Sequence, residues 1–175
     1  MTNVTTYSVK REIINAFMEL MTKKSYMDIT VTDIINEAQV ARASFYRNFN
    51  SINDVIDTII DEMSNEFIDD ILPTLMCNNE RQWREFLFEY FYRFGRNQKK
   101  IGFNNPQNIS VMFSRMDTKM REKEKEFPYE TLSDKYTAFG KFGLINNIAK
   151  KWMDSGMQET PEEMIDYIMS FITKF

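Results

Sequence analysis

The sequence predicts an all-α protein, in which a small N-terminal unit of three helices precedes a larger helical bundle, giving about nine helices in all. Glycine and proline, which interrupt regular structure, number only 5 and 4 among the 175 residues. Methionine and phenylalanine, whose long side chains suit packing between helices, number 13 and 15. A chain of this length can bury a core without help from a metal or a disulfide.

The N-terminal part predicts three helices in quick succession. Residues 7–24 carry apolar side chains at spacings of three and four, which indicates an amphipathic helix. The run Thr30-Val31-Thr32-Asp33 predicts a capping box that starts a second, short helix ending near Ala38. Residues 42–49 form a third segment, which is too short to be a stable helix alone and must therefore pack on its neighbours.

The remaining segments predict longer helices. The run Ser51-Ile52-Asn53-Asp54 opens a helix that keeps its periodicity until Pro73 and links the two parts of the chain. Aromatic side chains crowd residues 81–103 beyond what one amphipathic stripe requires. Further helices are expected at about 106–127, at about 130–155 with Gly156 as the C-cap, and from Thr160-Pro161 onward.

The second and third segments fit a helix-turn-helix, in which a tight turn joins two short helices. The apolar residues that would pack these helices together are Ile34, Ala38, Val40, Phe45 and Phe49. The stretch from Thr30 to Phe49 resembles the signature of the TetR family, which reads loosely T-V-x-x-I-x-x-x-A-x-V-x-x-x-x-F-Y-x-x-F. The resemblance covers about residues 10–60 and keeps its spacing throughout.

The resemblance implies a transcription regulator that binds a pseudo-palindromic operator in double-stranded DNA as a homodimer, typically a repressor that a small-molecule ligand releases. It also implies a helix-turn-helix DNA-binding domain at residues 1–50 and a helical ligand-binding and dimerisation domain at residues 51–175. A recognition helix enters the major groove with its N-terminal residues facing the base edges. The residues expected to contact DNA are Thr30, Thr32, Arg42, Ala43, Ser44, Tyr46, Arg47 and Asn48.

Base recognition is expected from the start of the third helix. Arg42 is the strongest candidate, because a guanidinium can make a bidentate contact with guanine. Ala43 can touch a thymine methyl, and Ser44 and Arg47 are near enough on the same helix to reach bases or phosphates. Tyr46 aligns with the family tyrosine that contacts the DNA backbone.

Contacts to the DNA backbone are also expected from Thr30, Thr32 and the amides at the start of the second helix, and these set register rather than sequence. The sequence departs from the family at two places. Gln39 stands where a turn glycine is common, which implies a modest backbone cost if this residue is left-handed. Asn50-Ser51-Ile52 stands where the family often reads K-S-K, so a lysine contact to phosphate is missing and a reduced DNA affinity or salt dependence is expected.

The C-terminal part resembles one branch of the same family, which includes regulators of dihydroxyacetone kinase operons. The resemblance rests on Tyr136-x-x-Phe139-Gly140-x-x-Gly143, on Trp152-x-x-x-Gly156-Met157, and on Thr160-Pro161-Glu162-Glu163-Met164. In that branch the last two helices pair with their copies in the partner subunit as a four-helix bundle. The residues expected at this interface are Gly140, Gly143, Ile145, Ile148, Trp152, Ile165, Ile168 and Ile172. For each of them, a place in the monomer's own core is the alternative.

The family also implies a ligand cavity among the middle helices. The aromatic residues that could line such a pocket are Trp83, Phe86, Tyr90, Phe94, Phe113, Tyr136 and Phe139. An aromatic core is an equally open interpretation for each of them. No convergent charged groups identify the class of ligand, so the small molecule stays unidentified.

The composition excludes most catalytic chemistry. The chain has no histidine and a single cysteine, Cys77, so the commonest general base and nearly every zinc-site pattern are missing. The sequence also has no glycine-rich phosphate loop and no paired carboxylates at a convincing spacing. We therefore expect no enzymatic activity, no catalytic residues, no cofactor and no metal.

The net charge of −4 divides unequally along the chain. Residues 1–50 carry six basic and five acidic side chains, so six minus five gives +1 there and leaves −5 for the rest. This asymmetry permits DNA binding at the N-terminus without requiring it. No signal peptide and no run of about 20 apolar residues is present, so a cytoplasmic protein with no membrane partner is expected. A TetR-shaped ligand-binding or interaction protein, or an activator, with weakened DNA binding is the alternative.

Overall fold

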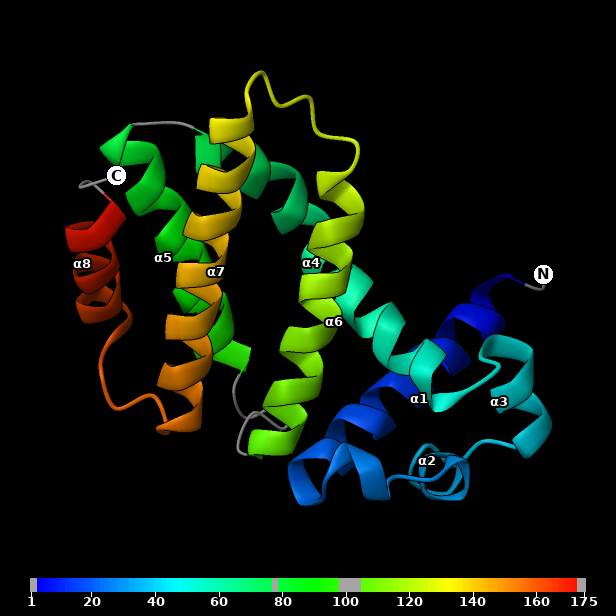
Figure 1. Cartoon of the computed structure of the whole chain (residues 1–175). Coiled ribbons are helices and arrows are strands. Elements are labelled where there is room, and N and C mark those ends of the chain that lie inside the picture. Colours follow the sequence, from blue (N-terminus) through cyan, green and yellow to red (C-terminus); the bar gives the residue numbers. More distant parts are fainter. Residues whose placement is uncertain (1–2, 77–78, 98–104, 173–175) are drawn as a thin grey trace.

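The computed structural model describes residues 3–76, 79–97 and 105–172, and Figure 1 shows their arrangement. This part of the chain contains eight α-helices and one short 3-10 helix, with no strand. The prediction of an all-α fold is therefore confirmed. None of the helices in the described residues is long and apolar enough to cross a membrane.

Three α-helices form the N-terminal helix-turn-helix unit, which lies at one end of the molecule (Figure 1). They are α1 (Asn3–Lys23), α2 (Val31–Glu37) and α3 (Arg42–Asn48), and α1 packs against both of the others. Phe17 of α1, Ile34 of α2 and Phe45 of α3 are completely buried. Burial of these apolar side chains lets helices of seven residues persist, since such short helices are unstable alone.

The short helix η1 (Tyr26–Asp28) precedes α2 and was not expected from the sequence. Ser25 caps it by accepting a hydrogen bond from the Met27 amide. The predicted capping box of α2 is confirmed, because the Thr30 hydroxyl accepts from the Asp33 amide at 3.2 Å while the Asp33 carboxylate accepts from the Thr30 amide at 2.8 Å.

Helix α4 (Ile52–Met76) connects the helix-turn-helix unit to the C-terminal bundle. Its predicted capped start is present, because the Ser51 hydroxyl accepts from the Asp54 amide and donates to the Asp54 carboxylate. The expected end at Pro73 was wrong, since the helix continues to Met76. A proline removes one backbone hydrogen bond and its ring crowds the carbonyl four residues earlier, but here it lies in the last turn of the helix.

The C-terminal bundle contains α4 with α5 (Glu80–Asn97), α6 (Pro106–Glu124), α7 (Leu132–Asp154) and α8 (Pro161–Ile172). Helix α7 packs on α4 and α6, and α8 packs on α5 (Figure 1). The predicted C-cap at Gly156 is confirmed by its left-handed φ of 83°. The predicted start of α8 is also confirmed, because Thr160 and Glu163 form a reciprocal pair of capping hydrogen bonds.

Candidate nucleic-acid interface

The outer face of α3 is polar, basic and exposed, whereas its inner face is apolar. Arg42, Ala43, Tyr46 and Arg47 are exposed, and Phe45 is completely buried. Positions three and four apart share a face of a helix, so the four exposed residues point to the same side of α3. This face has the dimensions and chemistry that a major groove accepts.

Tyr46 holds Arg42 in place on this face. The Arg42 guanidinium lies 5.7 Å from the centroid of the Tyr46 ring, within the range of a cation–π interaction. The Tyr46 ring in turn makes an edge-on contact with Phe45 at a centroid distance of 5.4 Å. Tyr46 is nevertheless 48% exposed. One edge of the residue therefore packs on the helix-turn-helix unit, and the other faces solvent.

Ser44 and Asn48 lie at the side of α3 and are half-buried. The Ser44 hydroxyl accepts a hydrogen bond of 2.8 Å from Arg47, and the Ser44 carbonyl accepts one of 2.8 Å from the Asn48 amide group. These contacts pre-order the Arg47 and Asn48 side chains beside the exposed face. The oxygen of Asn48 and the remaining N–H groups of Arg47 are the atoms that could reach DNA.

Thr30 and Thr32 are exposed at the start of α2, but the Thr30 hydroxyl is already committed. It donates to the Asp33 carboxylate at 2.7 Å and accepts from the Asp33 amide. The Lys24 ammonium lies 2.8 Å from the same carboxylate. This ion pair and the Thr30 hydrogen bonds lower the pKa of Asp33 to about 2. A phosphate at this end of α2 would therefore meet a carboxylate as well as amides.

The turn between α2 and α3 carries the backbone cost that the sequence implied. Gln39 has a φ of 54°, in the left-handed region. A side chain in that region is disfavoured by about 1–2 kcal/mol relative to the usual helical conformation. The Val40 amide bonds to the Ile35 carbonyl at 3.1 Å and closes the turn, so the surrounding hydrogen bonds hold Gln39 in this conformation.

The start of α4 holds the Asp54 carboxylate, close to the Asn50-Ser51-Ile52 stretch where the family often has lysines. Asp54 accepts hydrogen bonds from the Asn50 amide at 2.8 Å and from the Asn50 side chain at 2.9 Å. The Ser51 hydroxyl and then the Asn50 groups lower the pKa of Asp54, so this carboxyl stays ionised. A negative charge here disfavours a phosphate at the same helix end. The sequence pattern predicted the cap of α4, but it did not predict that the capping carboxylate would disfavour a phosphate there.

The expected dimer-interface residues divide into two groups. One group is buried inside the monomer and consists of Ile145, Trp152, Ile165, Ile168 and Ile172. For these five the structure shows the alternative, a place in the monomer's own core, where Trp152 packs edge-on against Phe91 of α5. Apolar spacing marks a buried face without telling which neighbour covers it. Gly140, Gly143 and Ile148 keep at least partial exposure, so their role at an interface stays a prediction.

Other side chains of α7 and α8 form an exposed surface with apolar character. We call it the α7–α8 face and define it by Tyr136, Gly140, Gly143, Leu144, Ile148, Tyr167 and Phe171. Tyr136 is 63% exposed and Tyr167 is 53% exposed. A groove of about 720 Å³ runs between the two helices and is lined by Leu144, Ile148 and Tyr167 among others. Sequence reasoning assigned Tyr136 to the ligand pocket and did not single out Tyr167, so it did not predict the aromatic part of this face.

The expected pocket residues do not come together around one cavity. Trp83, Phe86 and Tyr90 are buried and stack in series at centroid distances of 6.0 Å. The Tyr90 hydroxyl donates to Asn146 at 2.9 Å, and burial raises the pKa of Tyr90 so that it stays protonated. Phe113 is also buried, whereas Tyr136 and Phe139 are exposed. The side chain of Phe94 lies outside the described residues.

A pocket of about 330 Å³ lies beside the buried Lys141 and is lined by Tyr136, Thr137, Gly140 and Leu144. The Lys141 ammonium lies 3.4 Å from the Leu75 carbonyl near the end of α4 and 5.4 Å from the Trp83 ring centroid. Its charge therefore stabilises the end of that helix. Within the described residues, no group of three or more carboxylate or cysteine side chains is placed to hold a metal ion.

Comparison with known proteins agrees with this geometry. Residues 13–59 match the family described as bacterial regulatory proteins, tetR family. A search of curated protein sequences found no match. The fatty acid degradation regulator FadR from Bacillus halodurans has a similar structure, with a TM-score of 0.67 and 16% identity over 94% of each chain.

Two further solved structures have the same fold. A TetR transcriptional regulator from Streptococcus agalactiae has a TM-score of 0.58 and 21% identity, over 96% of this chain and 95% of that one. The dihydroxyacetone kinase operon activator DhaS has a TM-score of 0.55 and 19% identity, over 94% of this chain and 93% of that one. At these identities the likeness is one of fold.

The N-terminal unit therefore has the helix-turn-helix of bacterial regulatory proteins, and the described residues have the fold of solved transcription regulators. Residues 13–59 match the TetR family model, and the likeness of the remaining residues to TetR-family structures is one of fold.

Proposed function

We propose that the protein is a homodimeric, operator-specific repressor that a small molecule releases from DNA. The observation that carries the proposal is the exposed face of α3, where Arg42, Ala43, Tyr46 and Arg47 point to one side. We place the boundary between a DNA-binding domain and a ligand-binding and dimerisation domain at about residue 50, just before α4 begins. The cytoplasm is the compartment in which such a regulator would meet its DNA.

In this proposal Arg42 reads a guanine and Ala43 packs on a thymine methyl. Tyr46 donates its hydroxyl to a phosphate, and Arg47 with Ser44 and Asn48 supplies further base or phosphate contacts. Thr32 and the amides of α2 contact the backbone. Thr30 acts through the cap that orders those amides rather than through its own hydroxyl, which the Asp33 contacts occupy.

Dimerisation is proposed to use the α7–α8 face. A groove of about 720 Å³ with Tyr167 on its wall is the kind of surface that a second copy of a helix can fill. Gly140 and Gly143 carry no side chain, and a Cβ at either would meet no atom within 4 Å, so a partner helix can approach closely there. A two-fold dimer presents two copies of α3, which matches the symmetry of a pseudo-palindromic operator.

The ligand is proposed to bind in the C-terminal bundle, either at the pocket beside Lys141 or by parting the aromatic residues around Tyr90. Activation of transcription is the second candidate, because the structural neighbour DhaS is described as an operon activator. A third candidate is a TetR-shaped binding protein with weak DNA affinity, which the carboxylates at the starts of α2 and α4 favour.

A gel-shift titration with DNA from beside the protein's own gene tests the proposal. We expect a discrete shift that survives an excess of unrelated DNA and weakens steeply as salt rises, since phosphate contacts release counterions. A variant with both Arg42→Ala and Arg47→Ala is the matched control and should lose the shift while keeping its helix content. A wild-type protein that binds all DNA equally weakly would favour the third candidate.

A further inference from the structure

Asn108, in the first turn of α6, is a polar side chain with no exposed surface. A buried amide is costly unless its donors and acceptor are satisfied. The Asn108 side chain accepts a hydrogen bond of 2.7 Å from the Tyr26 amide. It donates to the Met21 carbonyl at 2.9 Å and to the Lys24 carbonyl at 3.3 Å.

These three partners surround the end of α1, which finishes at Lys23. The last four carbonyls of a helix have no amide of their own helix to accept from, and Met21 belongs to this set. A residue of the C-terminal bundle therefore supplies part of the C-cap of a helix in the helix-turn-helix unit. The junction needs a side chain with an acceptor for the Tyr26 amide and an N–H donor for two carbonyls. An asparagine provides both groups, whereas an aspartate has no N–H donor.

Neighbouring contacts reinforce this junction from both sides. The Ser25 hydroxyl donates to Gln107 at 2.5 Å, directly before Asn108. The Tyr26 hydroxyl bonds to Asn53 of α4, and Arg115 of α6 bonds to the same Asn53 at 2.8 Å. The end of α1 is thus tied to α6 and α4 together.

The helix-turn-helix unit has two separate attachments to the bundle. One is α4, which continues from the unit into the bundle and which α1 also contacts, with an ion pair of 2.9 Å between Arg11 and Glu62. The other is the junction at Asn108. Figure 1 shows α6 meeting the C-terminal end of α1, whereas α4 leaves the unit beside α3. The contacts of α1 with α4 hold the unit on one helix, and the junction at the far end of α1 adds a restraint through α6 against rotation about α4.

We infer that Asn108 is a positioning residue that fixes the angle of the helix-turn-helix unit and thereby sets the half-site spacing that the dimer accepts. The inference rests on the proposed function as a dimeric DNA-binding protein. Both recognition helices must engage at once, so the fit between their separation and the half-site spacing decides the affinity for a full operator. The base-contacting face of α3 is not touched, so the sequence read within each half-site stays the same.

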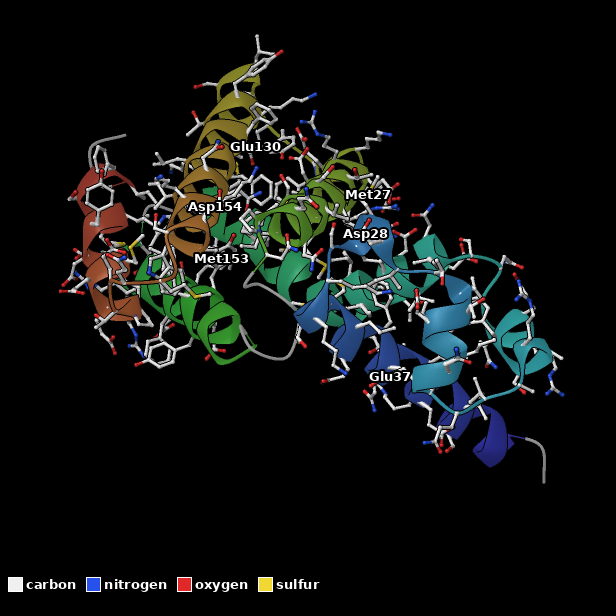
Figure 2. The ribbon with its side chains drawn as sticks, turned by 90° about the horizontal axis from the view of Figure 1, so that it is seen from below. Met27, Asp28, Glu37, Glu130, Met153 and Asp154 are labelled. Carbon is white, nitrogen blue, oxygen red and sulfur yellow. The ribbon has the colours of Figure 1, made fainter. Side chains whose placement is uncertain are left out.

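Figure 2 shows the molecule from below, with Met27 and Asp28 marking the loop that follows α1 and Met153 and Asp154 marking the end of α7. The two substitutions of Asn108 change the α6 side of the junction with that loop. Asn108→Leu removes all three hydrogen bonds at similar size. Asn108→Asp keeps the acceptor for the Tyr26 amide but sets a carboxylate oxygen against two carbonyls.

The test uses the full-length protein and two DNA sets. Selection from random DNA with the wild type first defines the half-site, and binding is then measured to operators that differ only in spacer length. We expect the wild type to prefer one spacing by roughly tenfold over its neighbours, and both Asn108 variants to lose most of this preference. Both variants should keep the half-site sequence preference of the wild type.

Asn146→Leu is the control, because it removes the acceptor of the Tyr90 hydroxyl inside the bundle and leaves the junction intact. It should lower the melting temperature and retain the wild-type spacing profile. Asn108 variants with an unchanged spacing profile would overturn the inference, whereas a wild type that selects no sequence would overturn the proposed function instead. If Asn108→Leu does not fold, Asn108→Asp and the double variant Ser25→Ala, Gln107→Ala weaken the same junction and decide the question.

Discussion

Arg42, which we propose as a base-reading residue, is ordered by its neighbours in α3. It is the first residue of α3, and the N-cap residue Ala41 offers no side chain to the amides there. Its guanidinium lies over the Tyr46 ring, which limits the rotamers that it samples. Less conformational entropy is lost on binding when a side chain is already ordered. Arg42 is therefore better prepared for a base contact than an isolated surface arginine.

We expect Arg42→Ala to weaken binding to the selected operator by about 1–3 kcal/mol and to relax the preference at one base pair, because it removes a bidentate contact. Fluorescence anisotropy with single-base variants of the operator measures both effects. Arg121→Ala is the matched control, because Arg121 also lies over an aromatic ring, that of Phe139, but on α6. An equal loss on every DNA sequence would contradict the base-reading role of Arg42.

Asp33 predicts an acid-dependent weakening of the helix-turn-helix unit. Its pKa is lowered to about 2 by Lys24 and Thr30, so its contribution to stability is present above the pKa of an unfolded aspartate, near 4, and is lost as the pH falls toward 2. Asp33→Asn should destabilise the protein at neutral pH and should flatten the fall in melting temperature across that range. Asp28→Asn, in η1, is the control. Parallel pH profiles for wild type and Asp33→Asn would rule out this linkage.

At the scale of elements, the starts of the helices are the features that neighbouring residues in the sequence predict best. Four starts, those of α2, α4, α7 and α8, use a Ser or Thr whose hydroxyl accepts from the amide three residues later. Three of these caps were predicted, because the motif depends only on residues close in sequence. The cap that Asn108 gives to the end of α1 could not be predicted, since its donor lies 87 residues away.

The turn of the helix-turn-helix offers a direct test of local strain. We expect Gln39→Gly to raise the free energy of unfolding by roughly 0.5–1 kcal/mol, because glycine adopts the left-handed conformation without a Cβ penalty. Thermal and urea unfolding measure the change. Gln39→Ala keeps the Cβ and should give no such gain. A Gln39→Gly variant less stable than the alanine variant would show that the turn is not strained.

At the scale of the whole molecule, the arrangement of helices decides which apolar surface is left for a partner. Ile145 of α7 and the isoleucines of α8 point inward, so the apolar surface left exposed is the α7–α8 face with Tyr136 and Tyr167, which we propose as the dimer interface. Exposed apolar patches with a groove between them commonly mark protein interfaces. Ile168 has no exposed surface, so a substitution there tests the stability of the monomer and not the dimer interface.

We expect Gly143→Trp and Tyr167→Glu each to give folded monomers. Space is open at Gly143, so tryptophan fits the monomer but obstructs a partner helix. Glutamate at 167 places a charge where apolar surface would be desolvated. Light scattering measures the mass and circular dichroism the helix content.

Phe88→Glu, at another exposed aromatic residue on α5, is the control and should remain dimeric. Ile168→Glu should instead unfold the monomer. Dimers that survive the first two substitutions would place the interface elsewhere.

The sequence by itself determined the helical class, the order of the helices and the polar, basic chemistry of the exposed face of α3. These features depend on periodicity and on motifs within about five residues, as in Thr30 to Asp33 or Phe45 to Phe49, so neighbours along the chain suffice to predict them. Only the tertiary structure decided which faces are covered. It turned Ile165 and Ile168 into the monomer core, left Tyr136 outside and buried Asn108 against α1. Burial depends on residues distant in sequence, and apolar spacing is the same whether the covering neighbour belongs to the same chain or to a partner.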